Sequence, residues 1–114
     1  MKQIVLIRKD LKMRRGKEIA QGAHASLLAI LDRLDHPNVQ DWLNDDFTKI
    51  TVRVESESDL LFVYKSAESK GLICSLVQDR GFTEFDGTPT YTAVAVGPDT
   101  DENLRPLTGH LSLY

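Results

Sequence analysis

Short apolar runs alternate with longer helical patterns along this chain. A continuous β-branched run at 3–8 predicts a buried strand, and residues 16–35 repeat apolar side chains at helical spacing. Pro37 is expected to close this helix, because the residue before a proline is driven out of the helical conformation. The positions predicted to form its core-facing stripe are Ile19, Ala23, Leu27, Ile30 and Leu34.

The second part of the chain repeats the alternation. The predicted elements are a half-exposed strand at 49–54, a helix at 56–70, and strands at 72–77 and 90–96. Ser56 or Ser58 is available to cap the helix, and Gly71 is well placed to end it. Gly97-Pro98 is expected to close the last strand, and a polar loop follows. The order β-α-β-α-β-β predicts one α/β domain over residues 1–114, with a mixed, mostly parallel sheet.

The overall composition is that of an ordinary globular protein, with 41% hydrophobic and 27% charged residues. No apolar run approaches the roughly 20 residues needed to span a bilayer, and no signal-peptide pattern is visible at the start. The single cysteine, Cys74, excludes an internal disulfide and a cysteine-cage metal site. These features predict a cytoplasmic protein that does not associate with a membrane.

Positive charge is concentrated at the start of the chain, although the net charge is −3. Half of the 14 Lys and Arg residues lie within the first 17 positions: Lys2, Arg8, Lys9, Lys12, Arg14, Arg15 and Lys17. A protein with one basic end can dock a polyanion there while its acidic remainder stays solvated. A solvated charge run with no partner is the alternative interpretation.

Three polar side chains share one face of the first predicted helix. At about 100° per residue, Lys17, Gln21 and His24 fall within roughly 60° of one another, and helix packing does not require them. Near the helix start, Lys17 can bind phosphate or stabilise an oxyanion. Gln21 can orient a water or an amide, and His24 can act as a general base or a donor. An exposed lysine, a surface glutamine and a packing histidine are the ordinary structural alternatives.

A second polar group follows the third predicted strand. Asp79 precedes a glycine-containing turn, and Thr83 brings a hydroxyl to the same loop. Asp79 can position water or pair with Lys17, whereas ordinary turn chemistry is the alternative. Since sites in such sheets gather beyond the carboxyl ends of strands, the loops at 8–17 and 79–83 are expected to border one cleft. The histidines lack ligand spacing and no motif for phosphate, dinucleotide or covalent chemistry is present, which favours water-mediated chemistry without metal or cofactor.

Taken together, these residues resemble the type 2 (archaeal and eukaryotic-type) peptidyl-tRNA hydrolases. The matching residues follow in order along nearly the whole chain: Arg8, Asp10, Leu11, Met13, Gly16, Lys17, Ala20, Gln21, His24, Ala25, Asp79, Gly81, Thr83, Gly97, Pro98, Thr108, Gly109, Leu111, Leu113 and Tyr114. The resemblance implies a mixed four-stranded sheet flanked by helices. It also implies metal-free hydrolysis of the ester between a peptide and the terminal ribose of tRNA, and a homodimer.

Carried over residue by residue, the resemblance implies an active site made of Lys17, Gln21, His24, Asp79 and Thr83. In the expected mechanism Asp79, through Thr83, orients the attacking water, while Lys17 and the helix-start N–H groups stabilise the oxyanion. Gln21 and His24 position the ester or support this network. The residues expected to hold tRNA phosphates are Arg8, Lys9, Lys12, Arg14 and Arg15. A non-catalytic RNA- or protein-binding module on the same fold, and a hydrolase of another ester or amide, are the alternatives.

Two residues depart from the family's pattern. Many members read Ala-Gly-Arg-Thr-Gln after the aspartate, whereas this chain reads Arg-Gly-Phe-Thr-Glu over residues 80–84. Phe82 replaces a cation and Glu84 adds a negative charge, while Arg80 supplies a cation nearby. These changes are expected to alter the contacts with RNA more than the chemistry at Asp79.

Overall fold

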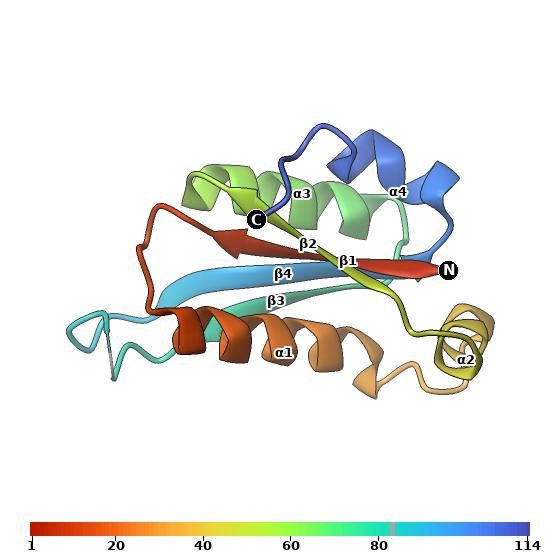
Figure 1. Cartoon of the computed structure of the whole chain (residues 1–114), viewed down its shortest axis with the longest axis horizontal. Helices are drawn as coiled ribbons and strands as arrows, with labels where there is room; N and C mark the ends of the chain where they lie inside the picture. Colours follow the sequence, from red (N-terminus) through yellow and green to blue (C-terminus); the bar gives the residue numbers. More distant parts are fainter. Residues whose placement is uncertain (83) are drawn as a thin grey trace.

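Helices cover both faces of one sheet in the computed structural model, which describes residues 1–82 and 84–114 (Figure 1). The elements in chain order are β1 (Lys2–Arg8), α1 (Arg15–Leu31), α2 (Pro37–Asn44), β2 (Lys49–Val54), α3 (Glu57–Ser69), β3 (Cys74–Asp79), β4 (Thr90–Asp99) and α4 (Asp101–Thr108). α1 lies on one face of the sheet, and α3 and α4 lie on the other. This arrangement confirms the predicted α/β class. Within the described residues, we find no helix with both the length and the hydrophobicity to cross a membrane.

The sheet has the strand order β2-β1-β4-β3. β1 and β2 are parallel, while β4 runs antiparallel to both β1 and β3. The mixed four-stranded sheet is confirmed, but the expectation of mostly parallel strands is wrong. β4 follows β3 through a loop rather than a helical crossover, and a loop connection of this kind produces an antiparallel pair. β1 and β3 both run antiparallel to β4, so they run in the same direction as each other. Their carboxyl ends therefore still lie at the same end of the sheet.

Hydrogen bonds from nearby side chains, and a glycine, mark where the helices begin and end. α1 ends at Leu31, four residues before the predicted end at 35, and the Arg33 side chain donates to the Ala29 carbonyl oxygen at 2.9 Å. α3 begins as predicted after Ser56, whose hydroxyl oxygen accepts from the Asp59 N–H at 3.0 Å. Gly71 then ends α3 with a φ of +71°, a conformation that favours glycine.

The end of the chain differs from the prediction. β4 continues to Asp99, beyond the expected end at Val96, and the predicted polar loop contains α4. The Thr100 hydroxyl caps α4 by accepting from the Asn103 N–H at 3.2 Å. Only two apolar side chains of this short helix are buried, and Pro106 lies inside it, so its pattern resembles that of a loop.

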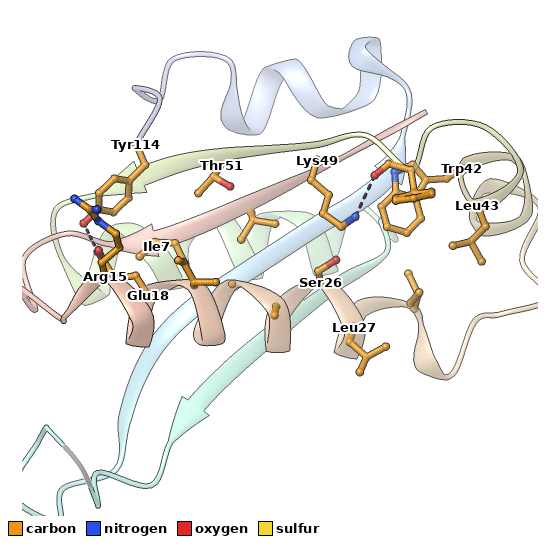
Figure 2. Close-up of a pocket in the computed structure, with 16 residues that line it drawn as sticks. Ile7, Arg15, Glu18, Ser26, Leu27, Trp42, Leu43, Lys49, Thr51 and Tyr114 are labelled. Atoms are coloured by element: carbon orange, nitrogen blue, oxygen red, sulfur yellow. Dashed lines mark hydrogen bonds between the residues drawn. The ribbon is translucent and has the colours of Figure 1, made fainter.

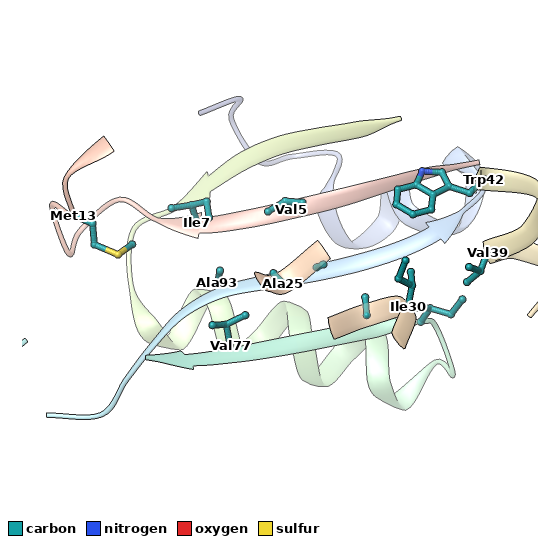
Figure 3. Close-up of a cluster of buried hydrophobic side chains, with 12 residues drawn as sticks. Val5, Ile7, Met13, Ala25, Ile30, Val39, Trp42, Val77 and Ala93 are labelled. Atoms are coloured by element: carbon teal, nitrogen blue, oxygen red, sulfur yellow. The ribbon is translucent and has the colours of Figure 1, made fainter. Parts of the chain in front are cut away.

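An apolar cluster fills the space between α1, α2 and the sheet (Figure 3). α1 contributes Ala25, Ala29 and Ile30 to this cluster, and the two alanines allow the helix to lie close to the strands. The predicted stripe is therefore wrong except at Ile30, because Ile19 and Leu27 are 67% and 54% exposed. The other two members of that stripe, Ala23 and Leu34, are also exposed.

Hydrogen bonds explain why polar side chains occupy the buried flank of α1. The Ser26 hydroxyl donates to the Gln3 carboxamide oxygen at 2.6 Å, and the Gln3 amide donates to the Ser26 and Gly97 carbonyl oxygens. The Ser75 hydroxyl on β3 donates to the Ala25 carbonyl oxygen at 2.7 Å. Buried polar groups that are paired in this way carry little penalty. These bonds fix the position of α1 on the sheet, and thereby the polar face that α1 carries.

Candidate active site

Two turns that are distant in sequence meet at the edge of the sheet. Lys17 lies in the first turn of α1, and Asp79 is the last residue of β3. The Lys17 Nζ lies 2.7 Å from Asp79 Oδ1, and the two side chains are only 16% and 13% exposed. The predicted cleft between the loops after β1 and β3 therefore brings an ammonium group and a carboxylate into direct contact.

Asp79 is held as a carboxylate. Its Oδ2 accepts from the Gly81 N–H at 2.8 Å, while Oδ1 accepts from Lys17. Burial raises the pKa of Asp79, but the hydrogen bonds from Lys17 and Gly81 and the charges of Lys17 and His24 together hold it below its usual value. A carboxylate with a lowered pKa is a weak base at neutral pH. Its environment suits it to orienting water and holding Lys17.

The turn after Asp79 depends on glycine. Gly81 has a φ of +85°, and a Cβ on it would lie 2.3 Å from the Thr88 carbonyl oxygen. The Gly81 carbonyl oxygen accepts from the Gly87 N–H at 2.8 Å, which ties the two sides of the β3–β4 loop together. The N–H that Gly81 donates to Asp79 is therefore held in place by the backbone of the loop.

Gln21 is buried beneath the ion pair. Its side chain is 3% exposed, and its carboxamide oxygen accepts a hydrogen bond from the hydroxyl of Thr92 on β4. The amide nitrogen is thus the end of Gln21 that can donate to a substrate. Thr92 was not among the predicted site residues. The sequence does not single it out, because Thr90, Tyr91 and Thr92 all carry hydroxyls and the register shift between β3 and β4 at this point cannot be read from the sequence.

The predicted polar trio faces one cavity. His24 is exposed on the same side of α1 as Lys17 and Gln21. The cavity has a volume of about 310 Å³ and is lined by Lys17, Gln21, His24, Val77, Gln78, Asp79, Arg80 and Phe82. The structure therefore brings together four of the five predicted catalytic side chains, and the fifth, Thr83, lies outside the described residues. Within residues 1–82 and 84–114, no three His, Cys, Asp or Glu side chains are grouped so that they could hold a metal ion.

Comparison with known proteins shows the family of the chain. A family model described as "Peptidyl-tRNA hydrolase PTH2" matches residues 1–114. The chain belongs to this family. Proteins named peptidyl-tRNA hydrolase are similar to it at 45% identity in Methanocaldococcus jannaschii, with 99% of each chain covered, and at 41% in Haloquadratum walsbyi, with 100% of each covered. A third, from Methanothermobacter thermautotrophicus, is 36% identical over 99% of each chain. The family resemblance stated from the sequence is confirmed.

In this PTH2 family member, the loop between β1 and α1 exposes most of its cations. Lys9, Lys12, Arg14 and Arg15 are exposed, and the Arg14 side chain reaches 91% exposure. Arg8 differs from them because it is buried. Its guanidinium donates to both carboxylate oxygens of Asp10 and to the Tyr91 carbonyl oxygen at 3.0 Å. These contacts suit Arg8 to bracing the loop, so its predicted contact with tRNA is not favoured.

Glu84, which departs from the family's pattern, contacts Arg14 in the loop between β1 and α1, here called the cationic loop. One Glu84 carboxylate oxygen accepts from the Arg14 backbone N–H at 3.4 Å, and the other lies 3.8 Å from the Arg14 guanidinium. Glu84 therefore links the β3–β4 loop to the cationic loop. The two loops lie at the same end of the molecule (Figure 1).

A larger groove lies away from the ion pair, on the opposite flank of α1 (Figure 2). It has a volume of about 740 Å³, and its lining is mostly apolar. Tyr114 and Glu18 close one end, where the tyrosine hydroxyl donates to the glutamate. Lys49 lies at the other end and donates to the Phe47 carbonyl oxygen at 3.1 Å. The exposed Leu27 borders this groove, so the side chains expected in the core instead line an open surface.

Proposed function

We propose that this protein hydrolyses peptidyl-tRNA to free peptide and free tRNA, using water as the nucleophile and no metal ion. The observation that carries the proposal is the contact between Lys17 and Asp79 in a cavity beside an exposed cationic loop. Membership of the PTH2 family and the names of its curated relatives support the substrate.

The proposed reaction adds water to the ester carbonyl carbon and breaks the bond from that carbon to the ribose oxygen. One proton of the water ends on the ribose oxygen, so the products are an RNA hydroxyl and a peptide carboxylic acid, which ionises. The Lys17 ammonium stabilises the oxyanion of the tetrahedral intermediate, an effect that typically contributes a factor of about 10² to 10³ in rate. Asp79 orients the water and holds Lys17, with Thr83 as a further participant. Gln21 and His24 position the ester.

The cationic loop supplies the proposed contact with RNA. Lys9, Lys12, Arg14 and Arg15 are exposed shortly before Lys17, which lines the cavity, and phosphate contacts of this kind dominate the affinity for nucleic acids. Because the proposed substrate arises during translation, we place the activity in the cytoplasm.

The test is release of peptide from purified peptidyl-tRNA, measured with and without a chelator. Turnover that the chelator does not change supports the proposal. Salt-sensitive binding of the RNA with no cleavage would instead identify a non-catalytic binding module. Equal activity on small acyl esters that lack RNA would identify a hydrolase of another substrate class.

We also propose that two copies pair through the flank of α1 opposite the ion pair. Ile19 and Leu27 form an exposed apolar ridge, and the groove lies directly beside it. In a dimer with two-fold symmetry, the ridge of each copy can pack into the groove of the other copy. Leu27→Lys is expected to convert a dimer to a monomer in analytical ultracentrifugation, whereas Phe62→Lys, at an exposed position on α3, is expected to leave it unchanged. A wild-type monomer at all concentrations would refute this pairing.

A further inference from the structure

The β3–β4 loop carries two phenylalanines in opposite surroundings. Phe85 is partly buried against the core cluster, and the Lys17 Nζ lies 5.8 Å from the centre of its ring. Phe82 is 79% exposed and lines the rim of the cavity that holds the ion pair. Burial of an aromatic side chain is what stabilises a fold, and the exposed Phe82 ring contributes little stability of this kind. Folding therefore does not account for an aromatic ring at this position.

The loop presents the Phe82 ring from an anchored backbone. Gly81 precedes it and is held by hydrogen bonds to Asp79 and Gly87, and Phe85 anchors the loop from the other side. An anchored backbone before the ring reduces the conformational entropy that is lost when a flat group packs on Phe82. This combination of exposure and anchoring is typical of a binding platform.

The charges around the ring favour RNA as its partner. Arg80 is an exposed neighbour, and Glu84 links the loop to Arg14 of the cationic loop. Aromatic rings beside cations are the features with which proteins bind unpaired nucleotides, because every base offers a flat face for stacking and its phosphate a negative charge. An apolar peptide side chain would gain nothing from the cations.

We propose that Phe82 stacks on the terminal nucleobase of the tRNA and thereby positions the ester next to Lys17 and Asp79. The inference rests on the proposed function. Phe82 is a positioning residue in this account, since it contacts the nucleoside and not the bond that breaks.

The experiment compares wild type, Phe82→Leu and Phe82→Trp on two substrates. The first substrate is peptidyl-tRNA, and the second is the same molecule with an abasic terminal nucleoside. Phe82→Leu is expected to raise KM about 5- to 150-fold on the first substrate, which is the range for loss of one stacked base. Phe82→Trp is expected to restore KM. Phe62→Leu, at a 72% exposed position on α3, serves as the matched control and should leave KM unchanged.

The abasic substrate shows whether Phe82 acts through contact with the terminal base or in another way. Wild type and Phe82→Leu should bind it equally weakly, since the partner of the ring is missing. An equal loss on both substrates, or a loss that follows the identity of the peptide's last side chain, would overturn the proposal.

A second readout separates this inference from the proposed function. Acceptor-stem RNA with 2-aminopurine as its terminal base should lose fluorescence on binding to wild type but not to Phe82→Leu. Quenching without any cleavage of peptidyl-tRNA would support the stacking and refute the hydrolase. Cleavage by wild type with no quenching would refute the stacking alone.

Discussion

Replacing Asp79 with asparagine removes one charge of the ion pair while nearly preserving the size of the side chain. The amide oxygen can still accept from the Gly81 N–H, so the loss is confined to the contact with Lys17. A hydrogen bond to a charged group contributes about 1.5–3 kcal/mol, and the low exposure of both side chains adds to the cost of leaving Lys17 without its carboxylate partner. We therefore expect Asp79→Asn to lower the free energy of unfolding by about 2 kcal/mol at pH 7.

The loss of unfolding free energy in Asp79→Asn should become smaller as the pH falls. The pKa of Asp79 is lower in the folded protein than its usual value, which is about 3.9 in an unfolded chain. The ionised carboxylate therefore stabilises the folded state fully above about pH 4, and this contribution disappears as the pH falls through the folded pKa. The difference between wild type and Asp79→Asn should shrink towards zero in acid.

Urea unfolding between pH 3 and pH 7 measures this difference directly. Trp42 is the single tryptophan and is 2% exposed, so its fluorescence reports global unfolding. Asp46→Asn, at an exposed position, is the matched control and should change the stability little at any pH. A difference for Asp79→Asn that stays constant across the pH range would assign the effect to packing. Equal or greater stability of Asp79→Asn at pH 7 would refute a stabilising ion pair.

Three further predictions follow from neighbouring contacts. Thr92→Val leaves the buried carboxamide oxygen of Gln21 without its donor and should cost about 1–3 kcal/mol in urea unfolding, whereas Thr92→Ser should retain most of the stability. Arg14→Gln should reduce the slope of the logarithm of the RNA-binding constant against the logarithm of the salt concentration by about 0.7–0.9. Arg8→Gln should leave that slope unchanged and lower the urea concentration at the midpoint of unfolding. Hydrogen bonding to a carboxylate raises the pKa of Tyr114 to about 12, so Tyr114→Phe should remove the component near pH 12 from a tyrosine absorbance titration. Persistence of that component in Tyr114→Phe would refute the contact.

The predictions that succeeded rest on local chemistry and on chain direction. The Ser56 cap and the Gly71 end of α3 follow from what serine and glycine do at helix ends. The meeting of Lys17 and Asp79 follows from the strand directions, because strands that run the same way end at the same edge of a sheet. That result needed no knowledge of the strand order, and it survived the wrong expectation of mostly parallel strands.

The predictions that failed depend on tertiary structure. A helical pattern locates apolar side chains but does not reveal which flank of the helix meets the sheet. In α1 the flank with small and polar residues is buried, because Ser26 finds a partner in Gln3, a residue distant in the sequence. Ile19 and Leu27 remain exposed as a result. The role of Thr92 depends on the same packing, since its partner Gln21 is 71 residues away.

The most direct test of the proposed centre is a double-mutant cycle on the cleavage of peptidyl-tRNA. Single-turnover rates are compared for wild type, Lys17→Met, Asp79→Asn and the double variant, with Lys65→Met at an exposed position on α3 as the control. If Lys17 and Asp79 act as one unit, each single variant should lose a factor of about 10² or more, and the double variant should be little slower than the slower single one. Wild-type rates in both single variants, or losses that multiply in the double variant, would contradict the account.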